Sequence, residues 1–129
     1  MRKLRFLLIG CGRISKNHIT AAAANPESME LCAVCDPVEE RARQKAEQLE
    51  GLTGKRPLVY TDYQKALEEV EIDCCAIATE SGFHAGIALD CIRRGKHVLV
   101  EKPMALSTKD AEQMLKEAEE HNVTLGVCH

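Results

Sequence analysis

Residues 4–15 read LRFLLIGCGRIS, a nearly continuous apolar run followed at once by a glycine-containing turn. Such a run is typical of a strand buried on both faces of a parallel sheet. Gly10 permits a tight bend and Gly12 lets a ligand approach the backbone, while Ser15 takes a packing position where a third glycine is common. The stretch predicts a strand, a turn and a helix. It leaves open whether the turn binds a pyrophosphate or only shapes the chain.

The rest of the chain repeats this order of short apolar runs and longer amphipathic stretches. Strands are expected over residues 4–10, 29–35, 58–61, 73–79, 97–103 and 123–128. Helices are expected over residues 13–25, 37–51, 62–70, 81–95 and 107–122. This alternation predicts an α/β fold, a doubly wound parallel sheet in the strand order 3-2-1-4-5-6. Ligands of such sheets bind beyond the carboxyl ends of the strands.

Two of the expected helices carry an apolar stripe at helical spacing. In the helix over residues 37–51, which Gly51 is expected to end, the stripe consists of Val38, Ala42, Ala46 and Leu49. In the helix over residues 107–122, the stripe consists of Ala111, Met114, Leu115 and Ala118. That helix begins with Ser107 and Asp110 in the spacing of a capping box. Both stripes are predicted to face the core.

Composition limits the class of protein and its partners. The 129 residues suit one domain, and the 45% of hydrophobic residues are enough for a globular core. A net charge of −3 gives no basic excess for nucleic acid or an anionic membrane. The apolar runs are too short for a membrane span, and the one near the N-terminus is too short for a signal peptide. We therefore expect neither nucleic acid nor a membrane as a partner.

Seven cysteines raise the question of metal binding or disulfides. Cys32 and Cys35 have CxxC spacing but lie in an expected strand, where residues three apart point to opposite faces. The neighbours Cys74 and Cys75 are expected to diverge for the same reason. These cysteines are predicted to be small buried hydrophobes, and no metal site is expected. Cys11 is the exception because it lies in the glycine turn.

An acidic residue at the end of the second expected strand bears on whether the glycine turn binds a dinucleotide. A dinucleotide fingerprint has such a residue about 20 positions after the turn, and Asp36 lies 21 residues after Ser15. Its carboxylate can accept both adenosine ribose hydroxyls and would repel a 2′-phosphate, which favours NAD over NADP. Alternatively, Asp36 is the N-cap of a helix with Pro37 at its first position. Arg41 either stacks near the adenine or is a solvated helix residue.

A lysine follows the fifth expected strand, in the sequence VLVEKP. Lys102 would lie at the carboxyl edge of the sheet, where a nicotinamide would be bound. A lysine there can hydrogen-bond a substrate hydroxyl and take its proton while hydride leaves the carbon. The alternative is a loop lysine whose backbone is restricted by Pro103.

These motifs together resemble the N-terminal domain of the glucose–fructose oxidoreductase / inositol dehydrogenase / rhizopine-catabolism (Gfo/Idh/MocA) family. The resemblance covers essentially all 129 residues and is carried by LIGCGRISKNH, VCDP, YTDY, IATESGFHAGIAL, GKHVLVEKPMALS and the terminal GVCH. It implies NAD(P)-dependent oxidation or reduction of a sugar, cyclitol or nucleotide-sugar alcohol. The opening sequence is most similar to members that act on UDP-linked amino sugars.

The resemblance also implies roles for individual residues. It assigns Lys102 as the catalytic or substrate-orienting residue, commonly followed in the family by a cis-proline, here Pro103. Cofactor contacts are implied at Gly10, Cys11, Gly12, Arg13, Ile14, Asp36, Ala78, Thr79, Ser81, His84, Glu101 and Lys102. Glu80 replaces a proline that is usual in the family, which weakens the assignment of the contacts at residues 79–84.

Family members continue into a second α/β domain that supplies substrate contacts, a catalytic histidine and the usual oligomer interface. We therefore expect residues 1–129 to be one dinucleotide-binding domain of a cytoplasmic, homo-oligomeric parent that carries this C-terminal domain. The domain alone is expected to bind NAD without turning over a sugar-like substrate. The alternative is a non-catalytic NAD sensor or regulatory module, which would have no need of Lys102 beside the nicotinamide.

Overall fold

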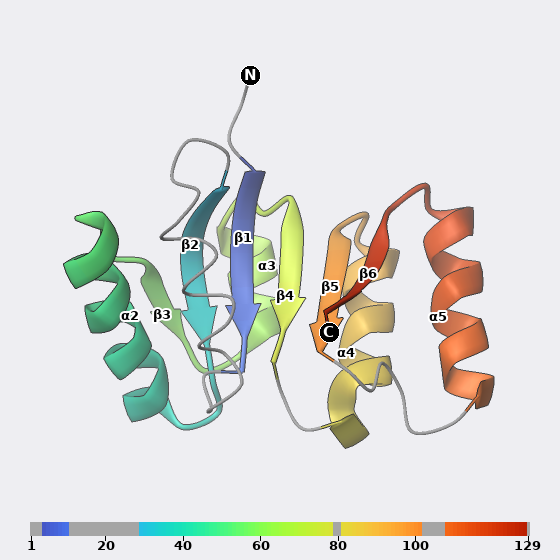
Figure 1. Cartoon of the computed structure of the whole chain (residues 1–129), viewed down its shortest axis with the longest axis horizontal. Coiled ribbons are helices and arrows are strands. Elements are labelled where there is room, and N and C mark those ends of the chain that lie inside the picture. The colour runs from blue at the N-terminus through green and yellow to red at the C-terminus, as the bar shows by residue number, and fades with distance from the viewer. Residues whose placement is uncertain (1–3, 11–28, 79–80, 102–107, 129) are drawn as a thin grey trace.

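The computed structural model describes residues 4–10, 29–78, 81–101 and 108–128. In this part of the chain, parallel strands form a six-stranded sheet in the order β3-β2-β1-β4-β5-β6 (Figure 1). The strands are β1 (Leu4–Ile9), β2 (Met29–Cys35), β3 (Leu58–Tyr60), β4 (Cys74–Ile77), β5 (His97–Glu101) and β6 (Leu125–Cys128). The order reverses between β1 and β4, so the predicted doubly wound sheet is confirmed.

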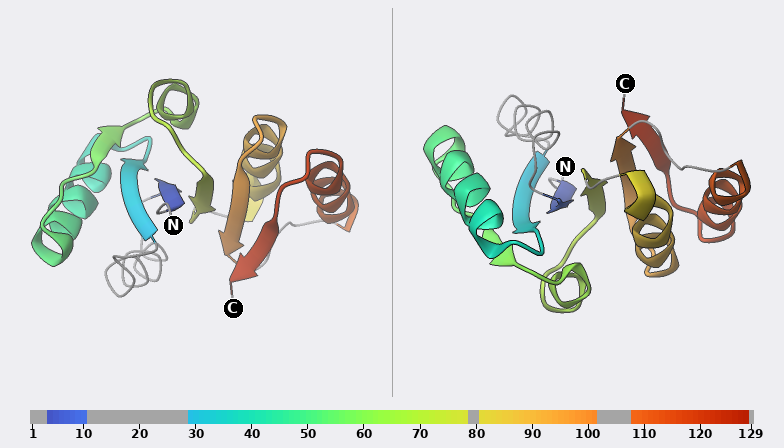
Figure 2. Two further views of the ribbon diagram at one scale, coloured as in Figure 1. Left: turned by 90° about the horizontal axis from the view of Figure 1, so that it is seen from above. Right: turned by 90° about the horizontal axis from the view of Figure 1, so that it is seen from below.

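Helices cover both faces of the sheet (Figure 2). They are α2 (Glu39–Thr53), α3 (Tyr63–Glu69), α4 (Ser81–Arg93) and α5 (Thr108–Glu120). Helix α2 lies on one face, and α3 and α4 lie on the other (Figure 2). The helix expected over residues 13–25 lies outside the described residues.

The central strand β1 is buried on both faces, as its apolar sequence predicts. Leu7 and Ile9 belong to the core cluster beneath α3 and α4, whereas Phe6 and Leu8 belong to the cluster beneath α2. All four side chains are at most 5% exposed. Strand β1 is therefore shared by the two cores and fixes their relative position.

Strand β2 departs from regular alternation at Cys32. The pairing of β1 with β2 shifts between Phe6 and Leu7, whose partners are Leu31 and Ala33. The extra residue, Cys32, forms a bulge, so it joins the same core cluster as Cys35. The prediction that these two side chains diverge was therefore wrong, whereas Cys74 and Cys75 do lie in opposite clusters. Cys32, Cys35, Cys74, Cys75 and Cys91 are buried thiols outside any disulfide.

Helix α2 begins and ends two to three residues later than the sequence predicts. Val38 is its N-cap and is 48% exposed, so this residue lies outside the helical stripe. The other three members of that stripe are buried. Gly51 does not end the helix but lies inside it. The helix ends at Gly54, whose backbone is left-handed (φ 80°) and whose N–H donates a hydrogen bond to the Glu50 carbonyl.

Helix α5 buries a narrower stripe than the sequence predicts. Met114 and Ala118 are buried, but Leu115 is 54% exposed. The helix packs against α4 and β6, and β6 is the edge strand of the sheet. The flank that carries Leu115 therefore has no strand beneath it. Ser107, the expected cap, lies outside the described residues.

Candidate functional site

The carboxyl ends of β1, β2 and β4 are joined by backbone hydrogen bonds that extend past the strands. The N–H of Gly10 donates to the Cys35 carbonyl over 2.7 Å, and the N–H of Ala78 donates to the Ile9 carbonyl over 2.7 Å. Gly10 has φ 95°, a conformation that a residue with a Cβ rarely adopts. The glycine turn therefore starts from a fixed point beside the end of β2.

Asp36 follows β2 directly and is only 5% exposed. Its backbone N–H donates to the Tyr60 carbonyl at the end of β3, over 3.1 Å. Its Oδ1 accepts a 2.8 Å hydrogen bond from the N–H of Val38. Because the helix N-cap is Val38, the alternative in which Asp36 itself caps α2 was wrong by two residues. The carboxylate instead forms a short turn that orients it at the sheet edge.

A cavity of about 330 Å³ opens beside Asp36. It lies between the ends of the first three strands and the helices α3 and α4, and its lining residues are Ile9, Cys35, Pro37, Thr61, Asp62, Tyr63 and Ile87. The volume falls in the range of small-molecule sites, and most of the lining is apolar. Such a cavity suits a flat apolar group attached to a polar one.

The thiol of Cys35, which lines this cavity, is unreactive at neutral pH. Burial, together with the negative charges of Asp36 and Asp62, raises the pKa of Cys35 to about 12. Cys35 is therefore a protonated thiol at neutral pH and packs as a small hydrophobe rather than acting as a nucleophile. Among the described residues, no three His, Cys, Asp or Glu side chains come together as a metal site.

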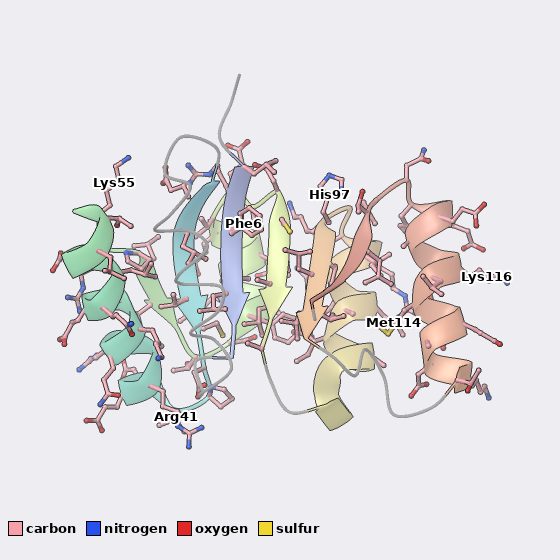
Figure 3. The ribbon with its side chains drawn as sticks, in the orientation of Figure 1. Phe6, Arg41, Lys55, His97, Met114 and Lys116 are labelled. Carbon is pink, nitrogen blue, oxygen red and sulfur yellow. The ribbon has the colours of Figure 1, made fainter. Side chains whose placement is uncertain are left out.

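The structure brings together only some of the residues singled out in the sequence. Gly10, Asp36 and Ala78 meet at the carboxyl edge. Arg41 is exposed on the first turns of α2, at the end of the molecule toward which the strand arrows point (Figure 3). Its side chain is not among the residues that line the cavity.

The remaining candidate residues are described in their backbone only or not at all. Helix α4 begins at Ser81 itself, and His84 lies in its first turn. Glu101 is the last residue of β5. The other candidates lie outside the described residues: Cys11, Gly12, Arg13, Ile14, Thr79 and Lys102.

Sequence reasoning missed the cavity wall formed by Thr61, Asp62 and Tyr63. These residues directly follow β3, so their position at the carboxyl edge was a usable signal. The sequence gives no such signal for Ile87, because this residue lines the cavity only as a result of how α4 packs on the sheet.

Comparison with known proteins bears directly on this site. The model of the oxidoreductase family with an NAD-binding Rossmann fold, Gfo/Idh/MocA, matches residues 4–129. The chain belongs to the Gfo/Idh/MocA family. The family, the Rossmann architecture and NAD as the cofactor, all predicted from the sequence, are therefore confirmed.

Solved structures and curated proteins are similar to this Gfo/Idh/MocA domain over most of its length. The WlbA dehydrogenase from Bordetella pertussis, crystallised with NADH and UDP-GlcNAcA, is 38% identical with a TM-score of 0.83, covering 98% of this chain and 37% of that chain. Inositol 2-dehydrogenase 4 from Saccharopolyspora erythraea is 35% identical over 89% of this chain and 32% of its own length. Glycosyl hydrolase family 109 protein 1 from Akkermansia muciniphila is 31% identical over 92% of this chain and 25% of its own length.

The chain thus spans about a quarter to two fifths of the length of these relatives. Within the described residues of this Gfo/Idh/MocA domain, none of the helices is long and apolar enough to cross a membrane.

Proposed function

We propose that the carboxyl edge of this sheet binds NAD with the adenosine ribose at Asp36. The observation that carries the proposal is the buried Asp36 carboxylate, which the Val38 N–H orients at the end of β2, between two residues, Cys35 and Pro37, that line the cavity. A fixed carboxylate accepts hydrogen bonds from the 2′- and 3′-hydroxyls and repels a 2′-phosphate. This supports NAD rather than NADP as the preferred cofactor.

The other parts of the cofactor follow from the direction of the sheet. The cavity beside Asp36 accommodates the adenine between Pro37 and Ile87. The turn that begins at Gly10 receives the pyrophosphate on its backbone N–H groups, as the glycine spacing of residues 10–15 predicts. The nicotinamide then lies toward β4 and β5, near Ala78 and Glu101.

We propose that the full-length protein is a dehydrogenase acting on a sugar, cyclitol or nucleotide sugar. When bound, NAD supplies the acceptor for hydride from the substrate carbinol carbon. Lys102 orients the substrate hydroxyl and takes its proton at Nζ, so that a carbonyl forms. The substrate contacts and oligomer interface belong to a further C-terminal domain. The WlbA similarity favours a UDP-linked amino sugar as substrate.

We place the protein in the cytoplasm. Cys32, Cys35, Cys74, Cys75 and Cys91 are buried thiols outside any disulfide, which suits a reducing compartment. The glycosyl hydrolase among the relatives supports a second candidate reaction, cleavage of a glycoside, on the same cofactor site.

Titration of the 129-residue chain with NADH and NADPH tests the cofactor site. NADH is expected to bind at least about tenfold more tightly, because a 2′-phosphate would face a buried carboxylate. Tighter binding of NADPH would overturn the role of Asp36, and no binding of either would overturn the proposal.

Assays of the full-length parent test the reaction. Incubation with NAD and UDP-linked amino sugars or inositols is expected to produce NADH, and Lys102→Ala is expected to abolish this while Lys102→Arg retains cofactor binding. Unchanged turnover in Lys102→Ala would remove the lysine from the mechanism. Cleavage of aryl glycosides without net NADH formation would favour the glycosidase, and cofactor binding without either reaction would favour the non-catalytic sensor.

A further inference from the structure

A cluster of hydrogen bonds between α3 and α4 converges on the carboxylate of Asp90. Tyr63 Oη donates to Asp90 Oδ2 over 2.8 Å. Gln64 Nε2 donates to the same oxygen over 2.8 Å. Arg94 Nε donates to Asp90 Oδ1 over 3.1 Å. Asp90 thus joins the first turn of α3 to the last turn of α4, with both of its oxygens used.

This arrangement keeps the carboxylate charged. Burial alone would raise the pKa of Asp90, but the hydrogen bonds from Tyr63, Gln64 and Arg94 outweigh it and lower the pKa. A charged acceptor makes a stronger hydrogen bond than a neutral one, so the Tyr63 hydroxyl is held firmly toward α4. The Tyr63 ring then has one orientation, packed partly against the core.

Tyr63 is also one of the residues that line the cavity at the carboxyl edge of the sheet. With its hydroxyl fixed on α4, the ring of Tyr63 is held in place in the wall of a cavity that Pro37 also lines. Nucleotide bases pack favourably on aromatic faces of this kind. A wall that is already oriented also avoids the entropy cost of ordering the side chain when a ligand binds.

We propose that Asp90 is a positioning residue for the adenosine half of the cofactor, acting by holding the Tyr63 ring as the wall against which adenine packs. The inference rests on the proposed NAD site and adds a specific contact to it. Tyr63 touches the base, whereas Asp90 acts only through Tyr63.

A second clamp on α4 provides a matched structural control. Arg93 Nε and Nη2 donate to the Glu117 carboxylate over 2.7 and 2.9 Å, which ties α4 to α5. Neither residue lines the cavity. Glu117→Gln therefore weakens an interhelical contact of α4 without touching Tyr63. Arg94→Gln removes one donor from Asp90 and leaves the Tyr63 hydrogen bond in place.

The experiment measures binding of two halves of the cofactor to the 129-residue chain by calorimetry. ADP-ribose probes the adenosine half, and reduced nicotinamide mononucleotide probes the other half. Asp90→Asn and Tyr63→Phe are expected to weaken ADP-ribose binding about three- to tenfold and to leave the mononucleotide unchanged. Arg94→Gln and Glu117→Gln are expected to bind both probes as the wild type does.

Intrinsic fluorescence supplies a second readout. The chain contains two tyrosines and no tryptophan, so its emission reports Tyr60 and Tyr63 alone. ADP-ribose is expected to quench the emission of the wild type and of Tyr60→Phe, but not that of Tyr63→Phe. This readout keeps the proposal testable even if Asp90→Asn fails to fold.

The outcomes separate the inference from the site on which it rests. If the wild type binds neither NADH nor ADP-ribose, the proposed cofactor site itself fails. If the wild type binds and Tyr63→Phe binds equally well with unchanged quenching, the site stands and the positioning role is overturned. Equal weakening in Glu117→Gln would also overturn it, because the effect would then be a general loss of packing around α4.

Discussion

The N–H of Val38 donates a 2.8 Å hydrogen bond to Oδ1 of Asp36 and so orients a nearly buried carboxylate at the end of β2. Asp36 thereby shapes the approach to α2, and its two chain neighbours, Cys35 and Pro37, line the cavity. Asp36 does not cap α2, because the N-cap is Val38, but its carboxylate forms the turn that precedes the helix.

Asp36→Asn separates these two roles. The amide oxygen can still accept from the Val38 N–H, so the turn and the stability of the fold are expected to survive. The loss of the charge-assisted bonds to the ribose is expected to weaken NADH binding about 10- to 100-fold. NADPH binding is expected to stay equal or to improve, because the repulsion of the 2′-phosphate is gone.

NADH fluorescence titration measures the effect of Asp36→Asn, and urea unfolding checks the fold. Glu39→Gln is the control, since Glu39 is an exposed acid at the start of α2 whose contact is with Arg43. Equal NADH affinity in Asp36→Asn and Glu39→Gln would argue against the ribose contact.

Gly10→Ala tests the conformation of the glycine turn. Gly10 has φ 95°, so an added Cβ is expected to cost about 1–2 kcal/mol of unfolding free energy through backbone strain. The matched control is Gly51→Ala, because Gly51 lies inside α2 with open space around the position of its missing Cβ. This substitution is expected to stabilise the chain by about 0.5–1 kcal/mol.

Urea unfolding measures the change in unfolding free energy of both variants, which is expected to be a decrease for Gly10→Ala and an increase for Gly51→Ala. A destabilisation of equal size at both positions would mean that an added Cβ is costly at either site, so that the left-handed backbone of Gly10 would not explain the response. A Gly10→Ala variant as stable as the wild type would contradict the turn geometry.

The alkaline titration of Tyr63 tests the bond to Asp90 independently of any ligand. Burial, with the hydrogen bond to Asp90, raises the pKa of Tyr63 to about 12 from its ordinary value near 10. The folded state therefore favours the protonated phenol. The resulting stability is fully present below pH 10 and is lost as the pH rises from about 10 to about 12.

Absorbance at alkaline pH follows this ionisation, and Tyr63→Phe identifies which of the two transitions belongs to Tyr63. Asp90→Asn is expected to move that transition down toward the ordinary value. An unchanged transition in Asp90→Asn would mean that burial alone sets the pKa of Tyr63.

The sequence predicts the strand order because short apolar strands alternate with amphipathic helices, a pattern typical of a doubly wound sheet. Leu7 and Leu8 are adjacent apolar residues that need cover on opposite faces, which only a sheet between two helical layers provides. Asp36 was found in the same way, since a strand end fixes the edge on which the next residue lies.

Features that depend on how elements pack were not predictable from local pattern. The bulge at Cys32 arises from the pairing of β2 with β1, so no periodicity within β2 reveals it. Ile87 reaches the cavity only because of the position of α4 on the sheet. Leu115 has the spacing of a buried residue but lies on the outer flank of an edge helix.

The edge strand β6 offers a last prediction, at Gly126. This residue pairs with Leu99 of β5, and a Cβ on Gly126 would lie 2.8 Å from Leu99 Cδ2. Gly126→Ala therefore forces the Leu99 side chain to move, which is expected to cost about 1 kcal/mol of unfolding free energy. Leu99→Ala alone is also expected to destabilise the chain, by about 2 kcal/mol, because Leu99 packs against the core beneath α2.

The double variant distinguishes a local clash from a general weakness of this edge. With Leu99 shortened, the added methyl at position 126 has room. The loss of unfolding free energy in the double variant is therefore expected to be about 1 kcal/mol smaller than the sum of the losses in the two single variants. Chemical denaturation of the four proteins of the cycle measures this coupling. Strict additivity would show that Gly126→Ala acts through the backbone of β6 rather than through contact with Leu99.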